Sequence, residues 1–291
     1  MKKTLIALAV LAASGASFAQ STVTLSGVYG VGITKTAGSV SALGQTDGGL
    51  TISVSEDLGG GMKVAAAQTL AFGKQGSGVT ADGGSITVSG GFGAAKFGTA
   101  CAGAALGEAV VGGAYHFAHA LGGGVDCREY QYGLYTAPEM VPGLGVAVRI
   151  QNMAAGGVVS VEDFSATGNG LQARFNYNVG AFTSAFYAKS NSSELHLGYN
   201  LGVIALKAGF DTQTTSGLKR SEFGATIPMG AATISFGYGV KTSAGGATDI
   251  KGTQLGVNYA LSKRTAINAV FGSFENATAD SSSRVNLVHT F

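Results

Sequence analysis

Basic side chains recur at the polar positions of segments in which polar and apolar residues alternate. The basic residues in this phase are Lys63, Lys96, Arg149, Arg174, Lys189, Lys207 and Lys241. The acidic residues in the same phase are Glu194, Asp211 and Glu222, whereas most other acids fall in connecting segments. Charges of mainly one sign along a water-filled passage bias which ions enter it. If these polar positions line a water-filled passage, the pattern predicts passive selection of ions, with a mild preference for anions.

Seven charged residues are expected to line this passage and its narrowest part. They are Lys63, Lys96, Glu108, Arg128, Arg149, Arg174 and Lys207, with Glu108 facing the cations. The alternative is that these charges only solvate the wall, because salt screens exposed charges over about 8 Å. The orientation of the strand after Arg128 stays open, since turning Arg128 inward also turns Tyr130 and Tyr132 inward and Gln131 outward.

Cys101 and Cys127 are the only cysteines, and they lie near the two ends of a long Ala- and Gly-rich segment at 99–126. In an oxidising compartment two such cysteines usually form a disulfide. We expect a bridge that fixes the base of the segment and contributes about 3–4 kcal/mol. His116 and His119 could suggest a metal, but no third ligand is indicated, and an ordinary loop role is expected for both.

Motifs for nucleotide binding or covalent catalysis do not occur in the sequence. There is no G-x-x-x-x-G-K-S/T, no G-x-S-x-G and no H-E-x-x-H. A pairing of His196 with Ser184 or Ser235 is conceivable, but no motif supports it. We therefore expect no enzymatic activity, no cofactor and no resident metal.

The N-terminus has the three parts of a secretory signal peptide. Lys2 and Lys3 precede an apolar run at 5–13, and Ser17-Phe18-Ala19 is typical of a cleavage site. We expect residues 1–19 to be removed and residues 20–291 to form one barrel domain. Without Lys2 and Lys3, 16 of the 18 basic residues remain against 16 acidic ones, which argues against a nucleic-acid partner.

Composition and periodicity together favour a transmembrane antiparallel β-barrel. Charged residues make up only 12% of the chain, about half the usual share, and no mature segment is apolar enough for a membrane helix. Glycine-rich breaks separate 16 expected strands, and short turns alternate with longer loops. The expected strands are 22–34, 50–54, 62–72, 85–89, 92–98, 129–137, 144–151, 171–179, 182–189, 194–200, 203–211, 222–227, 233–241, 254–260, 265–274 and 284–291.

The alternation assigns one face of each strand to lipid and the other to water. Leu206 and Phe210, for example, alternate with Lys207 and Asp211. A register slip of one residue would turn a cation such as Lys207 into lipid, at a cost of about 2–4 kcal/mol near the midplane. Aromatic residues near strand ends suit interface girdles, namely Tyr199, Tyr259, Phe271 and Phe274. Segment 99–126, the third outer loop, is expected to fold into the lumen; disorder is the alternative.

The chain resembles the general porins of beta-proteobacterial outer membranes. The matching stretches are STVTLSGVYG at 21–30, SEDLGGGMK at 55–63, SGGFG at 89–93, YTAP at 135–138, NYALSKRT at 258–265 and HTF at 289–291. They span the mature chain in the expected order. The chain departs from the family's arginine pattern, because Gly49 and Thr99 stand where arginines are usual, while Arg128 matches the sixth-strand arginine.

The resemblance implies a homotrimeric, 16-stranded diffusion channel in the Gram-negative cell outer membrane, in contact with outer-membrane lipid and lipopolysaccharide. It implies passage of ions and small hydrophilic solutes. It also implies that the barrel-assembly machinery reads the terminal Phe291 during insertion. An adhesin or structural anchor is the alternative function, although short outer loops give it little surface. A barrel hydrolase is a more remote one.

Overall fold

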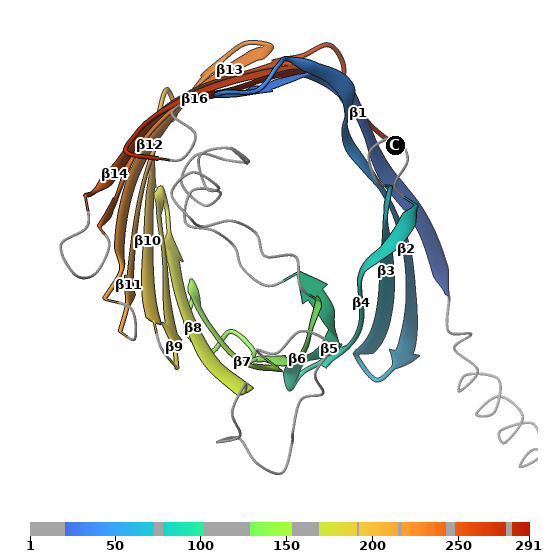
Figure 1. Ribbon diagram of the computed structural model, residues 1–291. Helices are drawn as coiled ribbons and strands as arrows, with labels where there is room; N and C mark the ends of the chain where they lie inside the picture. Colours follow the sequence, from blue (N-terminus) through green and yellow to red (C-terminus); the bar gives the residue numbers. More distant parts are fainter. Residues whose placement is uncertain are drawn as a thin grey trace, which may run out of the picture.

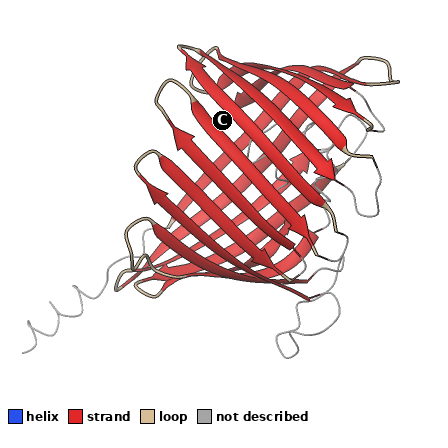
Figure 2. Ribbon diagram, turned by 90° about the vertical axis from the view of Figure 1, so that its left-hand side faces the viewer, coloured by secondary structure: helices blue, strands red, loops and turns tan. Residues whose placement is uncertain are grey.

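The structure is a computed structural model that describes residues 21–72, 78–101, 129–152, 169–190, 192–214, 217–242, 248–277 and 281–291. All 16 strands join in one closed antiparallel barrel, in which each strand pairs with its neighbours along the chain and β1 pairs with β16 (Figures 1 and 2). The predicted all-β class and strand number are therefore confirmed. Within the described ranges, no helix is long and apolar enough to cross a membrane.

The strand bounds follow the expected order along the chain. They are β1 (Thr22–Thr36), β2 (Ala42–Gly59), β3 (Met62–Phe72), β4 (Val79–Gly90), β5 (Gly93–Cys101), β6 (Glu129–Thr136), β7 (Leu144–Asn152), β8 (Asn169–Val179), β9 (Phe182–Lys189), β10 (Ser192–Asn200), β11 (Ala205–Gln213), β12 (Lys219–Met229), β13 (Ala232–Thr242), β14 (Ile250–Ala260), β15 (Thr265–Glu275) and β16 (Ser281–Thr290).

Several strands begin a few residues earlier than the sequence predicts, and β2 and β4 differ most. β2 starts eight residues before the expected 50, and β4 starts six residues before the expected 85. Both added stretches are rich in Gly, Asp and Thr, which are typical of loops, and both contain a bulge that shifts the register. In β4 the bulge includes Gly83, whose φ of 92° favours glycine. A bulge keeps the ladder paired through residues that break the two-residue period.

Apolar side chains face outward and polar ones line the lumen, as the alternation predicts. On β12, Phe223 is 48% exposed on the outer face, whereas the neighbouring Glu222 is 1% exposed on the inner face. Glu222 pairs in register with Gly209 and Gly239, so the inner wall has room for a long polar side chain. Phe274 is an exception, because it is 4% exposed and shares the inward phase of Gly272. The interface-girdle prediction for Phe274 is therefore wrong.

The closing seam, where β1 meets β16, is supported on its outer face by the C-terminal residue. Gly27 and Phe291 pair through two backbone hydrogen bonds of 2.9 and 3.1 Å between N–H and carbonyl groups. The Phe291 ring covers Gly27 so closely that a Cβ there would lie 2.4 Å from the ring. An aromatic ring over a cross-strand glycine is a recognised way to pin a strand pair.

The inner face of the closing seam is bridged by side chains that reach across β1. Asn286 on β16 donates to Thr46 at 2.9 Å and to Asp47 at 2.8 Å, both on β2. The bridge passes over Gly30 and Gly32, where a Cβ would come within 2.6 Å of Asp47 or 2.4 Å of Asn286. Thr46 is the extra residue of the bulge in β2, which turns its hydroxyl toward Asn286.

Candidate functional site

The candidate site is the inner wall of the barrel, and its most compact basic part surrounds Tyr132 on β6. The ring of Tyr132 is buried, with 9% exposure. The Arg149 guanidinium carbon on β7 lies 4.6 Å from the ring centroid, and the Lys96 Nζ on β5 lies 6.0 Å from it. The orientation that the sequence left open is thereby settled: Tyr132 points inward, while Gln131 and Tyr135 share the outer phase.

Arg174 on β8 joins this group through a shared recess. The recess has a volume of about 120 Å³ and is lined by Leu134, Ala147, Arg149, Gln172, Arg174 and Tyr187. The Nε and Nη2 atoms of Arg149 and the Nε atom of Arg174 are buried and have no hydrogen-bond acceptor within the described ranges. No described acidic residue forms an ion pair with Lys96, Arg149 or Arg174. We call these three residues the basic group.

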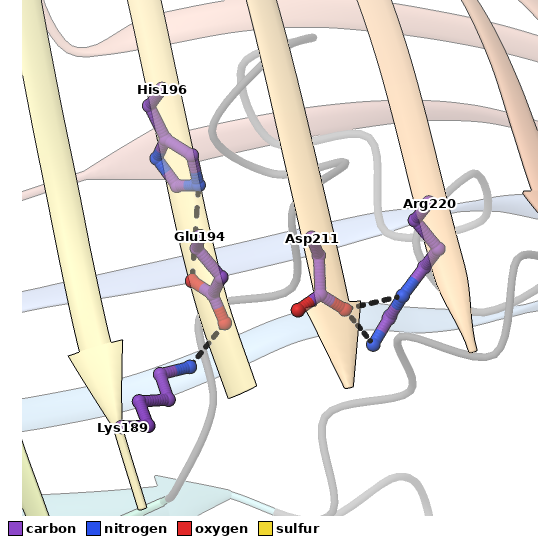
Figure 3. A network of polar contacts seen from close by, with 5 residues as sticks. All are labelled: Lys189, Glu194, His196, Asp211 and Arg220. Atoms are coloured by element: carbon purple, nitrogen blue, oxygen red, sulfur yellow. Dashed lines mark hydrogen bonds and ion pairs between the residues drawn. The ribbon is translucent and has the colours of Figure 1, made fainter. Parts of the chain in front are cut away.

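The wall from β9 to β12 is different, because two of its cations, Lys189 and Arg220, are paired with acids (Figure 3). Lys189 contacts the carboxylate of Glu194, and His196 Nε2 lies 3.9 Å from the same carboxylate. Arg220 binds Asp211 through Nε at 3.0 Å and Nη2 at 2.9 Å. Asp211 is only 2% exposed, and Arg220 compensates its charge at short range. These two ion pairs, which we call the paired wall, add little net charge to the lumen.

The other expected pore-lining residues are not brought together with the basic group. Lys63 lies next to the turn at 60–61 and pairs in register with Asp57. Lys207 lies near the start of β11, with Gly198 and Gly224 as its cross-strand partners. The predictions for Glu108, Arg128, His116, His119 and Cys127 fall outside the described residues, as does the one for the leader. Cys101 ends β5.

Tyr132 is a site residue that the sequence did not predict. Leu134 pairs with Arg149 in register, and Tyr132 lies two residues from Leu134, so alternation places the Tyr132 side chain on the same face as Arg149. The conceivable nucleophile–base pair of His196 and Ser184 is contradicted by the register. Ser184 pairs with Leu197, so it lies on the face of the sheet opposite to His196. Among the described residues no group of three or more His, Cys, Asp or Glu side chains is placed to hold a metal.

Comparison with solved structures places this architecture among porins. An anion-selective porin from Comamonas acidovorans superposes with a TM-score of 0.70 at 18% identity, covering 94% of this chain and 100% of that one. A triple mutant of the Rhodopseudomonas blastica porin superposes with a TM-score of 0.71 at 12% identity, covering 93% and 100%. At these identities the likeness shows the fold alone.

Comparison with curated protein sequences finds no match. The family profile described as Gram-negative porin, however, matches residues 4–279. This match covers nearly the whole chain, and it agrees with the closed 16-stranded barrel, apolar outside and polar within. The chain therefore belongs to the Gram-negative porin family, whose members are channel-forming β-barrels of the outer membrane.

Proposed function

We propose that this porin lets ions and small hydrophilic solutes diffuse passively across the outer membrane, with a mild preference for anions. The observation that carries the proposal is the closed barrel with an apolar outer face and a polar inner one, which suits a water-filled passage through lipid. No covalent chemistry, cofactor or resident metal belongs to this function.

The anion preference is supported by the distribution of unpaired charge on the inner wall. Glu194 and Asp211 of the paired wall are compensated by Lys189 and Arg220, whereas the basic group has no described acidic partner. An unpaired cation exerts a longer-ranged field on passing ions than an ion pair does. A solved porin of the same fold is itself described as anion-selective. Lys63, Lys207, Arg128 and Glu108 complete the proposed lining.

The route to the membrane and the assembled state are part of the proposal. Residues 1–19 would direct export and be removed, leaving residues 20–291 to insert through the barrel-assembly machinery, with Phe291 as the recognised terminus. The exposed apolar outer face suits contact with lipid and lipopolysaccharide and association into a homotrimer. We also propose that segment 99–126 narrows the lumen and that a Cys101–Cys127 disulfide fixes its base.

Single-channel recording in planar bilayers tests the function. The purified protein is expected to give stepwise current that rises with salt concentration, and a zero-current potential in a KCl gradient with the sign of chloride preference. An adhesin, a structural anchor or a barrel hydrolase would leave the bilayer electrically silent. Silence from a folded, membrane-inserted protein would reject the channel, and a cation-preferring potential would reject the selectivity. A shift of conductance after thiol reduction would support the disulfide.

A further inference from the structure

Tyr132 gives two members of the basic group, Lys96 and Arg149, an aromatic partner, and no described acid pairs with either. Lys96 and Arg149 come from the strands on either side of β6, and both pair in register with Leu134, two residues from Tyr132 on the same face. Their cationic groups lie 6.0 and 4.6 Å from the centroid of the ring. One buried ring thus contacts two like charges and attracts each of them.

The kind of partner decides what a passing ion senses. A carboxylate beside a cation cancels most of its charge at a distance, as Asp211 does for Arg220 at 2.9 Å. An aromatic face attracts a cation through its quadrupole and carries no net charge. A cation held by a ring therefore keeps the charge that an ion pair would cancel.

Arg149 also lines a recess that it shares with a second arginine. Arg174 lines the same recess of about 120 Å³, so a second positive charge lies beyond Arg149. Buried N–H groups of both arginines lack an acceptor in the described part of the chain. Among the contacts described for Arg149, the ring is the attractive one that opposes this repulsion.

We propose that Tyr132 is a positioning residue for ion selectivity, holding Lys96 and Arg149 on the lumen wall as charges that no described acidic residue compensates. This inference rests on the proposed anion preference and assigns it to one place, β5 to β8. The ion pairs of the paired wall then contribute little to selectivity, although they hold as many cations as Tyr132 does.

The test compares the zero-current potentials of variants in a KCl gradient. Tyr132→Leu removes the aromatic face and leaves every charge in place, and is expected to lower the anion-to-cation permeability ratio about twofold or more. Tyr132→Phe keeps the face and is expected to retain the ratio. The double variant Lys189→Gln with Glu194→Gln removes one ion pair without changing net charge, and should also retain it.

Three outcomes would overturn the inference. An unchanged ratio in Tyr132→Leu would show that the ring does not position the charges. An equal fall in Tyr132→Phe would assign the effect to the hydroxyl group. If Tyr132→Leu does not insert, Arg149→Gln takes its place, and an unchanged ratio there would exclude the basic group. Failure of the proposed function is distinct, because the parent protein itself would then be silent or cation-preferring.

Discussion

Replacing Asn286 by alanine is expected to weaken the closing seam from inside the lumen. The amide donates one hydrogen bond to the neutral hydroxyl of Thr46 and one to the charged carboxylate of Asp47. Net contributions are about 0.5–1.5 kcal/mol for a neutral hydrogen bond and about 1.5–3 kcal/mol for one to a charged group. Because Asp47 keeps 29% side-chain exposure and a contact with Arg284, we expect the loss of stability to lie at the lower end of the two summed ranges, about 2 kcal/mol.

Unfolding by urea in detergent micelles, followed through tryptic accessibility and the heat-dependent shift on gels, measures this loss. Ser282→Ala is the matched control, because it removes a polar atom from the same face of β16 that has no hydrogen-bond partner in the described part of the chain. The double variant with Asp47→Ala should show a coupling energy of about 1–2 kcal/mol. If Asn286→Ala resists urea as well as Ser282→Ala does, the bridge across β1 does not stabilise the barrel.

Three further predictions follow from the barrel wall. Gly32→Ala should lower the free energy of unfolding by about 1–3 kcal/mol in the same urea assay, because the new Cβ would lie 2.2 Å from a carbonyl oxygen of β16. Gly44, which pairs with Gly32 in register, faces open space and should accept alanine. Equal effects of the two substitutions would refute this. Phe223→Lys, on the outer face in the middle of β12, should weaken the free energy of membrane insertion by about 2–4 kcal/mol, and Glu222→Leu on the inner face by far less. The reverse order, in liposome insertion assays, would invert the assigned faces. Phe291→Ala should lower the yield of heat-resistant folded barrel while Phe291→Tyr keeps it; equal yields would show that the ring is dispensable.

The sequence by itself determined the fold class, the number of strands and the faces of most regular strands, although that of β6 stayed open. These features depend on a two-residue period and on turn residues such as Gly180 and Gly230, which act over a few neighbouring positions. Arg174 and Lys207 could therefore be assigned to the lumen without coordinates. The irregular starts of β2 and β4 could not be read in this way, because a bulge breaks the period on which the reading depends.

Only the tertiary structure decided which charges are compensated and what supports the basic group. Arg220 meets Asp211, and Arg149 meets Tyr132, because strand register places them side by side, and register is set by pairing along the whole sheet. The closing seam is the extreme case, since Asn286 and Thr46 are 240 residues apart in the chain and meet only when the barrel closes. The alternation of polar and apolar residues determines which side of the wall each side chain faces, but the closure of the barrel determines which side chains become its neighbours.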